Sequence, residues 1–337
     1  MSLLDWGPQS WMQYSRVPME QENSTTTVKK FFLVGFTESA MLQYIIFTTF
    51  LIIYAMTWLG NVTIITTVIT DQQLHKPMYF LLGNLAFIDL SESSVTLPKM
   101  LWDLLSEIKT ISFQGCITQM FFFHFTGGAV AILLIVMALD RYVALHKPLQ
   151  YQNIMNHNVL LGLVAGAWVG GFVHSIVQVA LITQLPFCGP NFLDNFYCDV
   201  PQIIKLACTD IFVVELLMVS NSGLLIILIF IVLIVSYAVI LVKIRTHITE
   251  GKHKAFSTCG AQLAVVSIHF VPCIFIYARP FQKLVVDKAM SSLYTVITPM
   301  LNPIIYTLRN TEMKNAISRL LNNIFFRMRN SQLSFLS

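Results

Sequence analysis

Charged residues are scarce in this chain of 337 residues. Asp, Glu, Lys and Arg together make up 11% of the sequence, whereas hydrophobic residues make up 55%. An ordinary soluble domain carries about 25% charged residues. A soluble chain of this length needs that charge to cover its surface, so the shortage predicts that lipid faces much of the protein. The net charge of +4 is modest, and we therefore expect no nucleic acid as a partner.

The sequence also lacks the motifs of catalytic and metal sites. It contains no HExxH zinc motif, no paired carboxylates and no glycine-rich phosphate loop. We therefore predict that the protein is not an enzyme and that it holds no metal or cofactor. A transporter is disfavoured as well, because the sequence shows no internal repeat that would relate two halves.

Seven apolar stretches are present, and each is long enough to cross a bilayer as a helix, which takes about 20 residues. The stretches lie at 44–67, 78–95, 120–143, 159–182, 211–242, 256–277 and 289–306. They do not alternate between apolar and polar residues, as the strands of a membrane β-barrel do. The sequence thus predicts an all-α membrane protein with a seven-helix transmembrane bundle. The second and seventh stretches carry the most polar residues.

Lysine and arginine are moderately enriched in the loops that lie inside if the N-terminus is outside. The glycosylation sequon at Asn23 agrees with this orientation, because N-glycans are added on the lumenal side. Disulfides also persist on the outer side, where four cysteines are expected, although their spacing leaves three pairings open. These cysteines are Cys116, Cys188, Cys198 and Cys208.

The chain divides into three predicted regions. Residues 1–43 form an extracellular segment, residues 44–308 form the transmembrane domain, and residues 309–337 form a cytoplasmic tail. Apolar residues recur at helical spacing in the tail between Met313 and Ile324. This pattern predicts a short amphipathic helix on the inner membrane surface.

Ionisable residues within membrane spans are costly, so each one is a candidate for a functional role. The few in this chain are Asp89, Glu92, Asp140, Arg141 and Glu215. Positive-inside anchoring alone can explain Arg141, but an acid directly before it also favours a switchable contact. Asn302, Pro303 and Tyr306 bring an amide, a kink and a hydroxyl into one helical turn, which favours a polar hinge.

Several segments repeat motifs that are found together in one receptor family. Asp-Arg-Tyr at 140–142 and Asn-Pro-x-x-Tyr at 302–306 resemble the signatures of rhodopsin-like G-protein-coupled receptors. The finer match is to vertebrate olfactory receptors, and it covers roughly residues 20–321. It rests on LHKPMYF at 74–80, MALDRYVA at 137–144, SY at 236–237, KAFSTC at 254–259 and PMLNP at 299–303.

The resemblance implies a fold, a location and a mechanism. The protein would be a multi-pass plasma membrane receptor that binds an odorant among the outer halves of helices 3, 5, 6 and 7. It would then activate a heterotrimeric G protein of the stimulatory type and raise cyclic AMP. Disulfides Cys116–Cys198 and Cys188–Cys208 would brace the second outer loop. The activation switch would comprise Asp89, Asp140, Arg141, Tyr237, Asn302, Pro303 and Tyr306, with Arg141 and Tyr237 meeting in the active state.

The sequence departs from the family pattern at a few switch positions. Leu139 stands where a Tyr is usual before Asp-Arg-Tyr, and Gln262 replaces the His that normally ends the helix 6 motif. Val130 occupies the place of an acid that many relatives carry in helix 3. A sodium site with Asp89 is therefore in question.

The expected pocket offers space, aromatic walls and few polar groups. Helix 3 presents no acid to pair with a cation, so we predict a small, neutral, mostly apolar volatile ligand. Interhelical hydrogen bonding is the alternative role of each polar candidate, and a non-odorant rhodopsin-like receptor for a small lipid or metabolite is the alternative function. The predicted ligand-binding residues are Phe123, His124, Gly127, Gly128, Asn221, Ser222, Tyr277 and Thr295.

Overall fold

The computed structural model describes residues 28–188, 191–247, 252–279, 284 and 286–335. The predicted glycosylation site at Asn23 lies outside these residues.

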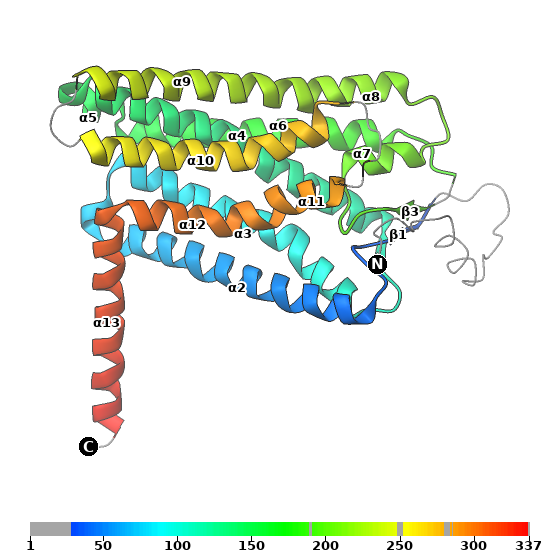
Figure 1. The fold of residues 1–337 in the computed structure, drawn as a ribbon, viewed down its shortest axis with the longest axis horizontal. Coiled ribbons are helices and arrows are strands. Elements are labelled where there is room, and N and C mark those ends of the chain that lie inside the picture. The colour runs from blue at the N-terminus through cyan, green and yellow to red at the C-terminus, as the bar shows by residue number, and fades with distance from the viewer. Residues whose placement is uncertain (1–27, 189–190, 248–251, 280–283, 285, 336–337) are drawn as a thin grey trace, which may run out of the picture.

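The helices of the described residues group into seven spans. The spans lie side by side in one bundle (Figure 1), which confirms the predicted fold class. The first four spans are α2 (Ala40–Thr70), α3 (Pro77–Leu105), α4 (Phe113–His146) and α6 (His157–Thr183). The fifth span consists of α8 (Phe212–Met218), the π-helical turn η4 (Val219–Leu224) and α9 (Leu225–His247). The sixth is α10 (Lys252–Tyr277), and the seventh consists of α11 (Asp287–Ser292), the π-helical turn η5 (Leu293–Ile297) and α12 (Thr298–Arg309).

Length and composition alone identify only part of this bundle as membrane-spanning. Within the described residues, five helical stretches are apolar enough to cross a bilayer, namely Ala40–Thr70, Phe113–His146, His157–Thr183, Phe212–Thr246 and Cys259–Tyr277. The other two spans, α3 and α11–η5–α12, carry more polar residues. In α3 these side chains include Asp89, Glu92 and Asp103, which are buried inside the bundle.

A small three-stranded sheet covers one end of the bundle, which we call the sheet end. The strands are β1 (Lys30–Leu33), β2 (Thr110–Ser112) and β3 (Phe192–Leu193). β1 lies in the middle, antiparallel to β2 and parallel to β3. The sequence did not predict this sheet, because strands of two to four residues are too short to show a period of two.

Short elements connect the spans. At the sheet end, α7 (Val200–Ile203) and η3 (Ile204–Leu206) follow β3. The loops at the other end contain η1 (Gln72–Leu74), η2 (Pro148–Gln150) and α5 (Tyr151–Ile154).

The last helix, α13 (Thr311–Phe335), leaves the end of the bundle opposite the sheet at a steep angle (Figure 1). It is longer than the short helix expected from the sequence. Its first turns are fastened to the loop before α3, where Lys76 Nζ lies 2.8 Å from Glu312 Oε2 and Arg319 Nη2 lies 2.6 Å from Asp71 Oδ2. Met313, in the first turn of α13, is fully buried. We call this end of the bundle the α13 end.

Spans α4 and α6 approach each other closely because glycines face each other between them. A Cβ atom on Gly171 of α6 would lie 2.4 Å from the carbonyl oxygen of Phe125 in α4, and one on Gly128 of α4 would lie 2.9 Å from Gly171 Cα. Small residues allow this close approach. Because lipid gives no hydrophobic driving force for helix association, the van der Waals contacts of the close approach stabilise the helix pair.

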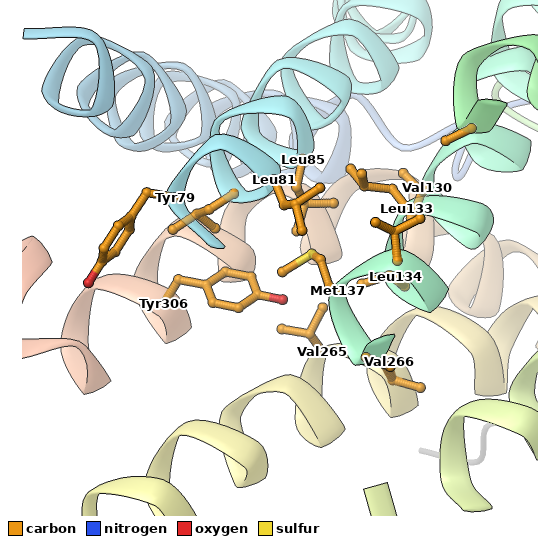
Figure 2. Close-up of a cluster of buried hydrophobic side chains, with 14 of the residues drawn as sticks. Tyr79, Leu81, Leu85, Val130, Leu133, Leu134, Met137, Val265, Val266 and Tyr306 are labelled. Atoms are coloured by element: carbon orange, nitrogen blue, oxygen red, sulfur yellow. The ribbon is translucent and has the colours of Figure 1, made fainter. Parts of the chain in front are cut away.

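A continuous apolar core fills the centre of the bundle toward the α13 end. Figure 2 shows Leu81 and Leu85 of α3 facing Leu133 and Met137 of α4, with the ring of Tyr306 of α12 beside them. Large apolar side chains also cover the outside of the bundle, among them Leu51, Val173 and Leu228. An apolar exterior of this kind is compatible with lipid and not with water.

Candidate ligand cavity and switch residues

The central cavity lies among α3, α4, α6, α10 and the fifth and seventh spans, and has a volume of about 100 Å³. A dry cavity of about 150 Å³ lined by apolar side chains holds benzene, so this cavity suits a ligand of only a few heavy atoms. Six of the eight predicted ligand-binding residues line it, namely Phe123, His124, Gly127, Gly128, Ser222 and Tyr277.

The two adjacent glycines of α4 play different parts in the cavity. A Cβ atom on Gly127 would meet nothing within 4 Å, so this position contributes open space. Gly128 instead lies against Gly171 and sets the distance between α4 and α6. Gly127 thus leaves room inside the cavity, whereas Gly128 is a packing residue at its edge.

Asn221 and Thr295 are not among the residues that line the central cavity. Thr295 is fully buried, and its hydroxyl donates a hydrogen bond to the Ser291 carbonyl oxygen at 2.8 Å. This bond lies within the seventh span, so it is intrahelical and not the interhelical bond named as the alternative role. Ser222, one residue after Asn221, accepts a hydrogen bond from Gln178 Nε2 of α6 at 2.6 Å.

A buried acid that the sequence did not single out lies beside the cavity. Asp199 follows Cys198 in the loop after β3, and the Tyr277 hydroxyl lies 2.8 Å from each of its carboxylate oxygens. Tyr197 donates to the same group at 3.1 Å, and His124 Nε2 lies 3.5 Å from Oδ1. Burial raises the pKa of Tyr197 well above its usual value, so its hydroxyl stays protonated and remains a donor.

This Asp199 cluster lies between two cavities. A second cavity of about 130 Å³ opens at the sheet end and is lined by Asp199, whereas Tyr277 lines the central one. Tyr294 of η5 closes the cluster, because its hydroxyl lies 2.6 Å from that of Tyr197. No sequence signal marked Asp199, since only the folding of its loop over the bundle brings it to this place.

Three further residues with a carboxyl or imidazole side chain line the central cavity. They are Glu92 of α3, His174 of α6 and His269 of α10. The His174 ring lies 5.8 Å from that of His124, centroid to centroid. The sequence identified Glu92 as a costly intramembrane acid, but it did not predict that this residue faces the ligand cavity.

Toward the α13 end, buried polar groups connect the first, second and seventh spans. Asn302 Nδ2 donates to both carboxylate oxygens of Asp89 at 3.0 Å. Asn61 Nδ2 donates to the carbonyl oxygen of Pro299 at 3.0 Å. Pro303 lies so close to Gly60 that a Cβ atom there would be 2.9 Å from the Pro303 ring. The seventh span is thus held against α2 and α3.

The charge pair at the end of α4 consists of Asp140 and Arg141, and Asp140 has contacts with Arg141 and with the neighbouring helix α5. Asp140 accepts a hydrogen bond from the Tyr151 hydroxyl of α5 at 2.6 Å, and Arg141 Nε lies 3.8 Å from Asp140 Oδ2. Arg141 Nε and Nη2 are buried without a hydrogen-bond acceptor. Buried unsatisfied donors of this kind call for an explanation.

Tyr237 and Tyr306 lie near this pair without bonding to it. The Tyr237 hydroxyl donates to Gln262 Oε1 of α10 at 3.3 Å, and the Tyr306 hydroxyl is buried with no hydrogen-bond partner. The contact between Arg141 and Tyr237 that is expected of an active state is therefore not formed in this conformation, in which Gln262 holds Tyr237.

Two disulfides brace the sheet end. Cys116 at the start of α4 is joined to Cys198, and Cys188 is joined to Cys208. These are the pairs that the family resemblance implies. The first disulfide ties Cys198, the residue before Asp199, to α4. A hydrogen bond from the Cys198 backbone nitrogen to Gln119 Oε1 at 2.9 Å adds a second tie to the same helix.

Comparisons with known proteins agree on one family. A family model described as olfactory receptor matches residues 50–324. The chain is 58% identical to olfactory receptor 4D1 of Homo sapiens over 90% of this chain and 97% of that protein. It is 55% identical to olfactory receptor 4Q2 of Homo sapiens over 89% of this chain and 95% of that protein. It is 50% identical to olfactory receptor 4E2 of Mus musculus over 88% of this chain and 96% of that protein.

Proposed function

The chain belongs to the olfactory receptor family, and from that premise we propose that it binds a small, mostly apolar volatile odorant in the central cavity and activates a stimulatory G protein. It is a multi-pass plasma membrane receptor coupled to G proteins, and it is not an enzyme. The observation that supports a small ligand is the cavity itself, which is about 100 Å³ in volume. The alternative of a non-odorant receptor loses support, because the matching relatives are olfactory receptors.

We further propose that the N-terminus and the sheet end face outward, with residues 1–43 extracellular and residues 309–337 cytoplasmic. The two disulfides at the sheet end support this orientation, because disulfides persist in oxidising compartments. The bias of Lys and Arg toward the loops at the α13 end supports it as well. Residues 44–308 would then contact membrane lipid through the apolar side chains that cover the bundle.

The proposed mechanism is a shift of population between two packings of the α13 end. A ligand that binds the open state more tightly favours release of α10 from the bundle. Release separates Tyr237 from Gln262, which now hold α9 and α10 together. The unsatisfied donors of Arg141 are then available to Tyr237 and to the G protein, while Asp89, Asn302 and Pro303 form the hinge.

The test measures cyclic AMP in cells that express the full chain and receive a panel of small volatile odorants. We expect at least one odorant to raise cyclic AMP through the wild type, and Arg141→Ala to abolish that response. Lys30→Ala removes a positive charge from an exposed position at the sheet end and serves as the matched control. Surface expression is measured for each variant with an antibody on intact cells.

Two results would contradict the proposal. If a receptor that reaches the surface answers no odorant in the panel, the proposed function is wrong. An undiminished response in Arg141→Ala would remove this residue from the activation mechanism and leave ligand binding intact.

A further inference from the structure

Glu92 is the only Asp, Glu, Lys or Arg among the described residues that line the central cavity. Its side chain is buried in the bundle, with 2% of its surface exposed. No residue within the described ranges donates a hydrogen bond to its carboxyl group or forms an ion pair with it. A carboxyl group without a partner thus faces an enclosed, mostly apolar space.

The other buried acids of the bundle have partners. Asp89, one turn before Glu92 in α3, accepts two hydrogen bonds from Asn302. Asp199 accepts hydrogen bonds from Tyr277 and Tyr197. Burying a charge is costly unless it is paired and hydrogen-bonded, and an intramembrane acid faces the same cost. Glu92 is therefore the buried acid whose missing partner a ligand can supply.

The rest of the cavity wall suits a small cation. The described lining residues include no Lys or Arg that would repel a positive charge. Phe123 and Tyr294 add aromatic rings, whose faces attract cations. His174 and His269 bring ring nitrogens that accept hydrogen bonds when the imidazole is neutral. Apolar residues such as Ile226 and Ile229 cover the remainder.

We propose that the ligands of the central cavity are small amines whose protonated nitrogen binds the Glu92 carboxylate. This inference rests on the proposed function and names the ligand class for the same cavity. A neutral ligand was predicted because the third span, α4, presents no acid to the cavity. Glu92 instead reaches the cavity from the second span, α3. The hydrocarbon part of the amine packs against the aromatic and aliphatic wall.

A protonated Glu92 that binds neutral ligands would respond differently to mutation than a carboxylate that binds amines. If Glu92 is protonated, it donates a hydrogen bond to a neutral ligand such as an alcohol or an aldehyde. Glutamine keeps a donor and nearly the same shape but has no charge. Glu92→Gln therefore removes the binding of amines and spares that of neutral ligands that accept a hydrogen bond.

The experiment uses the purified full chain in detergent and two probes of nearly equal shape, cyclopentylamine and cyclopentanol. Ligand binding to the native state raises the thermal midpoint by mass action, so a titration of the midpoint gives an apparent dissociation constant. We expect cyclopentylamine to bind the wild type more tightly than cyclopentanol does. In Glu92→Gln the amine should bind roughly 30-fold more weakly or worse, as for the loss of one partner of a buried charge pair.

Glu107→Gln is the matched control, because it removes the same carboxylate from an exposed position in the loop after α3. Its amine affinity should equal that of the wild type. The proposal is overturned if the amine does not stabilise the wild type, or if Glu92→Gln binds it as tightly as the wild type does. If Glu92→Gln does not fold, Glu92→Asp takes its place. This variant withdraws the carboxylate by one methylene, and unchanged amine affinity would again overturn the proposal.

Failure of this inference can be told apart from failure of the proposed function. Cyclic AMP is measured with the same two probes in cells. An amine that binds through Glu92 but evokes no cyclic AMP contradicts the proposed signalling and supports the ligand class. Neutral odorants that bind and signal, while amines do neither, contradict the ligand class and support the receptor function.

Discussion

Replacement of Gly171 by Ala tests the claim that glycine contacts between α4 and α6 build the cavity wall. The new Cβ atom would lie 2.4 Å from the Phe125 carbonyl oxygen and 2.7 Å from the Ala129 backbone nitrogen. Both neighbours belong to the backbone, so no side-chain rotation relieves the contact and the helices must separate. Overpacking of this kind costs about 1–3 kcal/mol, and we expect the upper part of that range. The better helix propensity of Ala returns up to about 1 kcal/mol, which leaves a net loss of about 2 kcal/mol.

Gly166→Ala in the same helix is the matched control. Its Cβ atom meets nothing within 4 Å, so only the helix propensity changes and stability should rise by up to about 1 kcal/mol. Thermal unfolding is followed with a thiol-reactive dye that reports exposure of the buried free cysteines Cys259 and Cys273. We expect Gly171→Ala to unfold at a lower temperature than the wild type and Gly166→Ala at the same or a higher one. Equal midpoints for the two variants would refute the reasoning.

Three further outcomes follow from the structure. Gly127→Ala should keep or raise the thermal midpoint, as Gly166→Ala does, but weaken the cyclic AMP response to the bulkiest active ligands several-fold, because its methyl group enters open cavity space. Tyr277→Phe should destabilise the protein by about 1.5–3 kcal/mol in the same dye assay, because Asp199 loses a donor that contacts both of its oxygens. The pKa of Asp71 is held below its usual value by the hydrogen bond from Arg319, so its contribution to the docking of α13 is present at neutral pH. That contribution is lost only as the pH falls below about 4. Asp71→Asn should therefore weaken docking at neutral pH and differ little from the wild type once Asp71 is protonated, as measured by amide hydrogen exchange in α13.

The transmembrane bundle was predictable because lipid imposes a strict demand on sequence. A span needs about 20 apolar residues and must satisfy its own backbone hydrogen bonds, and both requirements are visible in a linear chain. The two spans with the weakest apolar signal, α3 and α11–η5–α12, are those whose polar residues turn inward. The inward orientation of these polar residues depends on packing, so hydropathy alone does not identify the two helices as membrane spans.

The cavity was predictable in part. Gly127, His124 and Ser222 were identified because α4 and the fifth span carry them on faces that the family resemblance assigns to the ligand. Thr295 was placed there by the same argument, but it lies in the π-helical turn η5, it is not among the cavity-lining residues, and its hydroxyl donates to the Ser291 carbonyl oxygen. A π-helical turn changes which residues share a face, and no motif in the sequence announces it.

By itself the sequence determined the class of the protein, its seven spans and its family, because composition, periodicity and linear motifs carry that information. Only the tertiary structure decided which polar residues meet. Asp199 is one of many loop residues until the disulfide Cys116–Cys198 and the loop after β3 bring it to Tyr277 and His124. Glu92 is an unexplained acid until the packing of α3 turns it toward the cavity. Contacts between residues far apart in the chain arise from the packing of whole helices, which no local pattern records.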